Sequence, residues 1–207
     1  MADFNERSRA AYNEKADGFD NSREGQFTRG LQRLLLSHIT LEENQRVLDV
    51  ACGNGSLLSS INEIKPIMGF GIDIAERMIE NAIARNPNME FRVAGCEKIP
   101  FADKSMDIIT VCAAYHHFPD TSAFAGEAGR VLRPGGMIYV ADLNIPSFLR
   151  VIINPFVPIL LKDGDVRMYS PKEIICNFTR YGFEGVYETV EGNAQVVSLR
   201  KVSLPDI

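Results

Sequence analysis

The sequence predicts an α/β protein in which helices cover both faces of one doubly wound, mostly parallel sheet. Between residues 46 and 142, short apolar runs typical of buried parallel strands alternate with helical patterns. Their spacing is that of right-handed βαβ units, and two further strand-like runs close the chain. We therefore expect a three-layer fold of about seven strands, with an antiparallel terminal strand.

Length and composition fit one globular domain. A chain of 207 residues can bury one substantial core but is short for two. Its 45% hydrophobic and 24% charged residues exclude a disordered chain. The formal net charge of -5 offers no uniform cationic field to a polyphosphate, so we expect no large nucleic acid as a partner.

The N-terminus and the cysteines favour a cytoplasmic protein without a disulfide framework. The first residues are polar and lack the apolar core and small-residue cleavage site of a secretory signal. The four cysteines form no CxxC pair, so we expect free, buried thiols and no metal site. They are Cys52, Cys96, Cys112 and Cys176.

Residues 1–44 are expected to form helices that precede the sheet. A polar helical segment covers about residues 4–17. After it, Leu31, Leu34, Leu35 and Ile39 recur at helical spacing.

Residues 45–144 hold the predicted core. The first strand, residues 46–52, ends in a glycine turn, and Pro134–Gly136 is a strong stop between a helix and the last strand of this region. The remaining strands are expected over 68–73, 89–94, 106–114 and 136–142, with helices over 76–84 and 121–132.

The last part of the chain divides into an apolar segment and a closing unit. Within residues 145–170, the apolar run Phe148–Leu161 is interrupted by prolines and is too short to span a membrane. Residues 171–207 are expected to form a helix and two strands, joined as a hairpin at Gly192-Asn193.

A tight turn, Gly53-Asn54-Gly55, leaves the first strand where backbone can approach a ligand closely. Alone, this turn is compatible with dinucleotide binding or with a purely structural role. Leu58 occupies the third glycine position of a dinucleotide fingerprint, which disfavours a nicotinamide cofactor. Asp49 lies inside an otherwise apolar strand and requires a cationic or donor-rich partner.

The run VLDVACGNGSLL, from Val47 to Leu58, resembles the first motif of the Rossmann-like class I S-adenosylmethionine-dependent methyltransferases. The resemblance implies that the chain binds S-adenosyl-L-methionine and releases S-adenosyl-L-homocysteine. It implies that Asp49 orients the glycine loop and reaches the cofactor's ammonium group, directly or through water. The implied cofactor contacts in and beside the turn are Ala51, Cys52, Gly53, Asn54 and Gly55.

Asp73 ends the second predicted strand, at the distance from the glycine turn where such folds place a ribose-binding acid. Its two oxygens suit a vicinal diol, and capping of the following helix is a compatible role. Just beyond it, Ile74 and Met78 either pack on adenine or belong to the core.

The segment FRVAGCEKIPFADKSMD, from Phe91 to Asp107, is similar to the family's third-strand segment. Gly95 stands where the family usually has the aspartate that accepts from adenine's exocyclic amine, and this is a departure from the pattern. The resemblance implies that Cys96 offers its backbone N–H to adenine and that Glu97 falls on the family's glutamate. We therefore expect weaker or water-mediated contacts to adenine.

The segment CAAYHHFPD follows the fourth predicted strand at the edge where open α/β sheets bind ligands. The resemblance implies that the Ala113 backbone contacts the cofactor's methionine part and that Tyr115, His116 and His117 face the acceptor cavity. One histidine is a candidate general base near neutral pH. The alternative is a ring that only packs or holds the loop.

The apolar run Phe148–Leu161 lies where related enzymes insert a substrate cover, and it makes the chain similar to methyltransferases of the quinone-biosynthesis type. A hydrophobic acceptor is one interpretation of this run, and ordinary core or a dimer face is the other. Tyr12 and Phe19 either fold over the cofactor, as comparable family segments do, or form the core face of a helix.

These observations predict an enzyme that moves a methyl group to a small acceptor by in-line displacement, in which positioning supplies much of the acceleration. Two alternatives stay open. A noncatalytic cofactor-binding protein of the same fold is supported by Gly95, and an NAD-dependent oxidoreductase is opposed by Leu58. The expected state is a monomer or a homodimer, and the sequence does not identify the acceptor.

Overall fold

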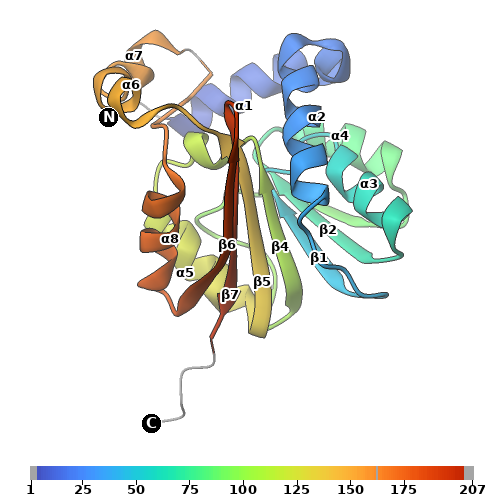
Figure 1. The fold of residues 1–207 in the computed structure, drawn as a ribbon. Coiled ribbons are helices and arrows are strands. Elements are labelled where there is room, and N and C mark those ends of the chain that lie inside the picture. Colours follow the sequence, from blue (N-terminus) through green and yellow to red (C-terminus); the bar gives the residue numbers. More distant parts are fainter. Residues whose placement is uncertain (1–3, 162, 203–207) are drawn as a thin grey trace.

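One sheet organises the part of the chain that the computed structural model describes, residues 4–161 and 163–202 (Figure 1). In these residues, seven strands are ordered β3-β2-β1-β4-β5-β7-β6. Strands β1 to β5 are parallel, whereas β7 is antiparallel to both β5 and β6, which confirms the predicted fold class. The strands are β1 (Arg46–Val50), β2 (Met68–Asp73), β3 (Glu90–Val93), β4 (Met106–Cys112), β5 (Leu132–Leu143), β6 (Phe183–Glu191) and β7 (Ala194–Lys201).

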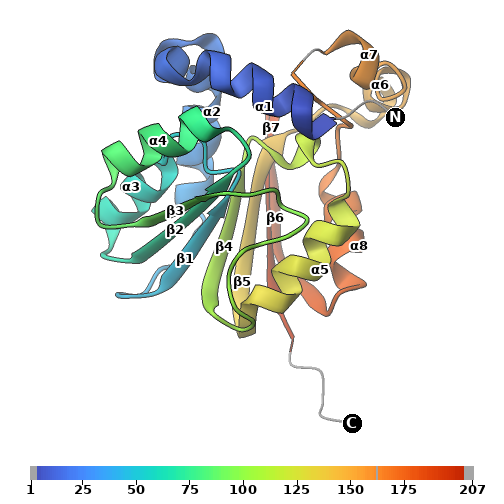
Figure 2. The same cartoon turned by 180° about the vertical axis from the view of Figure 1, so that it is seen from behind.

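Helices cover both faces of this sheet (Figures 1 and 2). One face packs on α5 and α8, and the other packs on α2, α3 and α4. Helix α1 lies across the edge formed by the carboxyl ends of the parallel strands (Figure 2). The helices are α1 (Phe4–Lys15), η1 (Ala16–Asn21), α2 (Arg23–Leu36), α3 (Ser56–Ile64), α4 (Glu76–Arg85), η2 (Tyr115–His117), α5 (Thr121–Val131), α6 (Ser147–Ile153), α7 (Val157–Leu160) and α8 (Pro171–Thr179).

Burial on both faces explains the continuous apolar sequence of β1. Side chains alternate across a strand. Leu48 and Val50 belong to the core beneath α5 and α8, whereas Val47 belongs to the core beneath α2, α3 and α4. Only Asp49 interrupts this pattern in β1 after Arg46, although it is also buried. Because Asp49 has almost no contact with bulk water, its carboxyl group must be satisfied by partners inside the protein or by a ligand.

Strands β1 and β4 end two residues before their predicted ends. The residues that follow them, Ala51 and Ala113, have φ of 58° and 56°. This left-handed conformation takes the backbone out of the sheet. Both strands therefore turn sharply at the same edge.

Strand β5 differs from the prediction at its N-terminal end. It begins at Leu132, directly after α5, so Pro134–Gly136 lies within the strand rather than before it. The register with β4 shifts between Met106 and Ile108, and Gly135 has φ of 79°. A bulge accommodates the proline and glycines that were expected to separate a helix from a strand.

The chain closes as predicted with an antiparallel hairpin. Strands β6 and β7 pair from Phe183–Lys201 to Glu191–Ala194, and Gly192 has φ of 58° at the turn. Insertion of β7 between β5 and β6 completes the order of the sheet.

The apolar segment 145–170 has most of its large side chains on the outside. Phe148 is 69% exposed and Ile159 is 76% exposed, whereas Val157 is buried. Helices α6 and α7 lie beside the N-terminal end of α1 (Figures 1 and 2). Most of these side chains are therefore not ordinary core, whereas a substrate cover and a dimer face both stay predictions. In residues 4–161 and 163–202, no helix is long and apolar enough to cross a membrane.

Replacing Leu58 by alanine should lower the free energy of unfolding by about 2–5 kcal/mol, because the fully buried side chain would leave a cavity beneath α3. Ile64→Ala on the same helix removes a side chain that is 57% exposed and should change this free energy by no more than about 0.5 kcal/mol. Equilibrium urea denaturation measures both. Equal effects would contradict the packing of α3 on the sheet.

Candidate functional site

A pocket of about 470 Å³ opens at the carboxyl ends of β1, β2 and β4. Its lining is mostly apolar, and α1, η1 and α2 contribute to its wall. Ligands bind at this edge in open α/β sheets. The pocket brings together most of the residues singled out in the sequence: Asp49, Ala51, Cys52, Gly53, Asn54, Asp73, Ile74, Met78, Cys96, Ala113, His116 and His117.

Asp49 is a buried acid with a single side-chain hydrogen bond. It is 2% exposed, and the Thr110 hydroxyl donates to its Oδ1 at 2.7 Å. Burial, assisted by the nearby Asp73 charge, raises the pKa of Asp49 to about 7. The carboxylate is therefore expensive to ionise until a cation or a further donor reaches it.

Asp73 ties the glycine turn to β2 and α4. Its Oδ2 accepts the Gly53 N–H and its Oδ1 accepts the Ala75 N–H, each at 2.9 Å. Burial raises the pKa of Asp73, and these two hydrogen bonds oppose that effect. Among the described residues, no basic side chain forms an ion pair with Asp49 or Asp73. The pocket thus holds two acids without a cationic partner.

The backbone is strained on two sides of the pocket. Ala51 and Ala113 both line it and both have positive φ, a conformation that costs a residue with a Cβ about 1–2 kcal/mol. Such strain persists where the surroundings impose it, as at ligand sites. It turns the strand ends of β1 and β4 so that backbone faces the pocket.

Gly55 and Asn54 fix the turn rather than widen the pocket. Gly55 has φ of 74°, and a Cβ there would lie 2.7 Å from Nδ2 of Asn86, so the glycine permits close packing of α3 on α4. The buried Asn54 amide donates to Asp20 Oδ1 at 2.8 Å and accepts from Arg85 at 2.9 Å. This network joins η1 to the turn.

Four predicted site residues lie outside the pocket lining. Tyr115 is fully buried in the core, where its ring packs against Phe118 and its hydroxyl accepts from Asn177 at 3.1 Å. It does not face the acceptor cavity. The other three are Gly55, Gly95 and Glu97.

His116 is held by the carboxylate of Asp142. Its Nδ1–H donates to Asp142 Oδ1 at 2.6 Å, and its backbone N–H donates to Oδ2 at 3.0 Å. Burial alone would lower the pKa of His116, but the charges of Asp142 and Asp165 raise it. The ring is therefore fixed in orientation, with Nε2 free to face the pocket.

His117 is a neutral neighbour of that ring. Burial and the His116 charge hold the pKa of His117 well below its usual value. Its Nε2 shares a hydrogen bond of 3.1 Å with the Tyr12 hydroxyl, and its Nδ1 has no hydrogen-bond partner among the described residues. The two imidazole centroids are 4.2 Å apart.

Helix α1 closes one side of the pocket through polar contacts. Tyr12 reaches His117, and Lys15 Nζ lies 2.6 Å from Asp163 Oδ2. Arg9 pairs with Glu76 on α4. Tyr12 and Phe19 both line the pocket and both also pack against a small core cluster, so the structure does not choose between the two arrangements that the sequence left open.

The sequence interpretation missed two acids of this site, Asp142 and Asp165. Asp142 ends a predicted strand at the ligand edge, and this position is itself a signal for a site residue. Asp165 comes from the loop between α7 and α8, where no local pattern marks it. Both are buried.

Comparison with known proteins shows that part of this chain is similar to methyltransferases. Residues 48–140 match the family described as a methyltransferase domain. A demethylmenaquinone methyltransferase of Chlorobaculum parvum is 35% identical over 105 residues, which are 51% of this chain and 44% of that protein. A 27-O-demethylrifamycin SV methyltransferase of Amycolatopsis mediterranei is 32% identical over 120 residues, which are 55% of this chain and 44% of that protein. The chain therefore aligns with less than half the length of these relatives.

The fold extends this likeness beyond the matched segment. One chain of a solved complex between the Haloferax volcanii Trm112 methyltransferase activator and a candidate methyltransferase superimposes on this chain with a TM-score of 0.79 at 19% identity. The superposition covers 93% of this chain and 98% of the solved one. Fold and site together define a Rossmann-like protein with its ligand site at the carboxyl edge of the sheet. Residues 48–140 are thus similar to a methyltransferase domain, which agrees with the resemblance of the sequence to the class I S-adenosylmethionine-dependent methyltransferases.

Replacing Ala51 by glycine should leave the free energy of unfolding unchanged or raise it by up to about 1 kcal/mol, because glycine adopts φ of 58° without steric cost. The control change Ala10→Gly, at an exposed position in the middle of α1, should lower it by about 1 kcal/mol. Equilibrium denaturation distinguishes the two. A loss at Ala51 as large as that at Ala10 would contradict the strained turn.

Proposed function

We propose that the protein transfers a methyl group from S-adenosylmethionine to a small, largely apolar acceptor. The observation that carries this proposal is a pair of acids, the buried Asp49 and the part-buried Asp73, which lie beside a strained glycine turn in one pocket and have no cationic side-chain partner among the described residues. A ligand with a positive charge and a diol fits these acids, because each carboxylate gains the partner it lacks.

Different residues of this chain would contact different parts of the cofactor. Asp49 would accept from the ammonium group, and Asp73 would accept from the ribose hydroxyls while it holds Gly53. The backbone at Gly53 lies open, since a Cβ there would meet only Met78 Sδ at 3.9 Å. Ile74 and Met78 supply an apolar surface for adenine. When bound, S-adenosylmethionine supplies a methyl group on a positively charged sulfur.

The adenine end is the less complete part of this proposal. Gly95 carries no side chain to accept from the exocyclic amine, and a Cβ there would lie 2.8 Å from Glu97 Oε2. Cys96 lines the pocket and offers its backbone N–H instead. We therefore place most of the binding free energy at the methionine and ribose ends.

The acceptor end is formed by His116, His117 and Asp165, with the apolar residues Leu143 and Met168 beside them. The protein's own contribution there is to orient the acceptor, exclude water and take up a proton when the nucleophile arrives protonated. The relatives act on demethylmenaquinone and 27-O-demethylrifamycin SV, which supports an apolar acceptor of moderate size for this chain.

Two other functions fit this pocket less well. Leu58 is fully buried where a dinucleotide fingerprint has its third glycine, which argues against NAD. A noncatalytic role gives no reason for the half-buried histidine pair at the acceptor end. S-adenosylmethionine should raise the melting temperature of the protein, whereas NAD should not.

Binding of S-adenosylmethionine should weaken as the pH falls through about 7. The free-protein pKa of Asp49 is about 7, and a bound ammonium group lowers it, so binding below that pH requires Asp49 to release a proton. The dissociation constant should rise up to about tenfold per pH unit between pH 7 and 5.5, a range in which the ligand's amino group stays protonated. Isothermal titration calorimetry measures this slope.

The matched control is Asp49→Asn, which keeps the side-chain shape and removes the titration. Its affinity at pH 7.5 should be lower than that of the wild type, and its dependence on pH should be shallower. An identical slope in both proteins would assign the proton to another group and contradict the role of Asp49.

Replacing His117 by glutamine should lower the methylation rate by about a hundredfold or more, because the variant loses the imidazole at the acceptor end. S-adenosylhomocysteine formation against a panel of oxygen, nitrogen, sulfur and carbon nucleophiles first identifies the acceptor. The matched variant His38→Gln, which removes an imidazole that stacks on Tyr187 away from the pocket, should keep the wild-type rate. Full activity of His117→Gln would remove the histidine from the reaction.

A further inference from the structure

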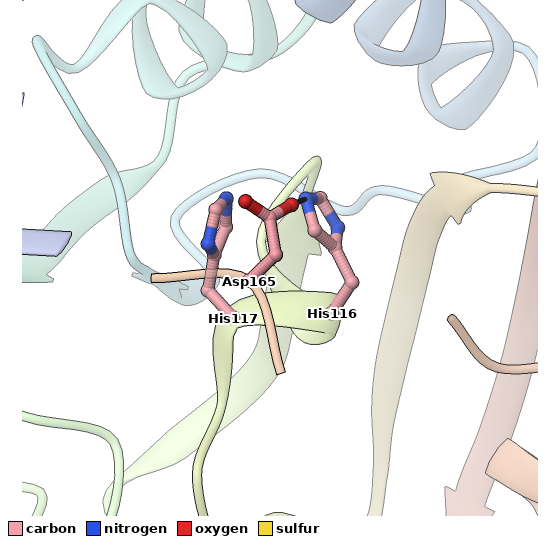
Figure 3. Close-up of side chains that lie close together, drawn as sticks. All are labelled: His116, His117 and Asp165. Carbon is pink, nitrogen blue, oxygen red and sulfur yellow. Dashed lines mark ion pairs between the residues drawn. The ribbon is translucent and has the colours of Figure 1, made fainter. Parts of the chain in front are cut away.

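Two imidazoles and one carboxylate meet at the acceptor end of the pocket (Figure 3). His116 and His117 come from the short helix η2, and Asp165 comes from the loop between α7 and α8. Each side chain offers one ligand atom, and the three atoms lie within 4.8 Å of one another. In Figure 3 the Asp165 carboxylate lies between the two rings.

Asp142 determines which nitrogen of His116 is available. Its carboxylate accepts the His116 Nδ1–H at 2.6 Å, and Oδ1 also accepts the Leu143 N–H at 2.7 Å. A proton held on Nδ1 leaves the lone pair on Nε2, which lies 3.6 Å from Asp165 Oδ1. This is the carboxylate–histidine arrangement that orients metal-ligating imidazoles in proteins.

With the neutral His116 ring, Nε2 and Oδ1 of Asp165 are two electron-rich atoms that face each other, whereas with the protonated ring they form an ion pair that a metal ion would replace. At 3.6 Å they are farther apart than a good hydrogen bond. Bonds of about 2.0–2.2 Å to a tetrahedral zinc ion would place two ligand atoms about 3.3–3.6 Å apart. The observed separation therefore suits a shared cation, and the third ligand atom lies within 4.8 Å of the other two.

His117 keeps a nitrogen for that third position. Its ring makes one side-chain hydrogen bond, with Tyr12 at 3.1 Å, while Nδ1 makes no hydrogen bond of good geometry among the described residues, although the Gly164 backbone lies near enough to the ring to act on its pKa. An unpartnered ring nitrogen in a buried site calls for a ligand. The loop that carries Asp165 is held in place, because Val166 N–H donates to the His116 carbonyl at 2.9 Å.

We propose that His116, His117 and Asp165 bind a divalent transition-metal ion such as Zn²⁺ beside the methyl-acceptor position. Two imidazoles and one carboxylate suit zinc and its neighbours in the first transition row. Three protein ligands leave at least one position for a water molecule or for an oxygen of the acceptor. The cysteine spacing gave no sign of this site because no cysteine belongs to it.

The use made of such an ion rests on the proposed methyl transfer, although its binding does not. An ion at this place would lower the pKa of an acceptor hydroxyl, so that its proton passes to solvent and an oxygen nucleophile is held for methylation. The ion would thereby favour oxygen nucleophiles over apolar carbon centres.

Titration calorimetry of the untagged, metal-stripped full chain with Zn²⁺ tests the proposal. We expect one ion per chain, with the affinity reduced in Asp165→Asn, His116→Gln and His117→Gln by more than the roughly 10–100-fold typical of losing an outer partner. Asp142→Asn should fall within that 10–100-fold range. The variants His38→Gln and Cys176→Ser, which change an imidazole and an exposed thiol elsewhere, should bind Zn²⁺ as the wild type does.

Two measurements keep this test independent of folding defects. Circular dichroism and the metal-free melting temperature show whether each variant is folded. The visible spectrum of the Co²⁺-loaded wild type should indicate nitrogen and oxygen ligands without a thiolate charge-transfer band. Absence of Zn²⁺ binding by the wild type, unchanged affinity in a folded Asp165→Asn variant, or thiolate bands would each overturn the proposal.

The outcomes also separate this site from the proposed function. Zinc binding at the cluster without any stabilisation by S-adenosylmethionine would support the metal site and contradict the methyl transfer. Stabilisation by S-adenosylmethionine without zinc binding would do the reverse.

Discussion

Negative charge buried at the carboxyl edge of the sheet is the constraint on which the rest of this structure depends. Asp49 and Asp142 are 2% and 3% exposed. Asp49, Asp73 and Asp165 line the pocket. Carboxylates in such places require hydrogen bonds or cations. The glycine turn, Thr110 and His116 supply part of what they need. The same acids that hold the loops together therefore prepare the pocket for a positively charged ligand.

Much of the fold could be predicted from the sequence because its central strands are buried on both faces. Continuous apolar runs mark β1 and β4, and the parallel topology then places their following residues at one edge. Ala51, Gly53, Asp73 and Ala113 were predicted from that reasoning and from the family resemblance, and they do line one pocket. The predicted start of β5 was wrong. Proline and glycine are typical of a turn between two elements, but here Pro134–Gly136 forms a bulge inside the strand.

The directions of side chains were harder to predict than their positions. Tyr115, His116 and His117 are consecutive, yet a single 3-10 turn sends the tyrosine into the core and the two histidines to the pocket. Asp165 joins them through a tertiary contact across a long stretch of chain. The apolar run that contains Phe148 shows the same limit, since hydrophobicity does not say which side of a helix is covered.

The N-terminal helix is held in a different way from the layers beneath it. Its hold on the molecule is mostly polar, through Arg9 to Glu76 and Lys15 to Asp163, and half-exposed ion pairs of this kind contribute little stability and are screened by salt. The hydrophobic layers beneath it are far more costly to separate. Salt therefore weakens the polar contacts of α1 more than it weakens the packing of the layers beneath it.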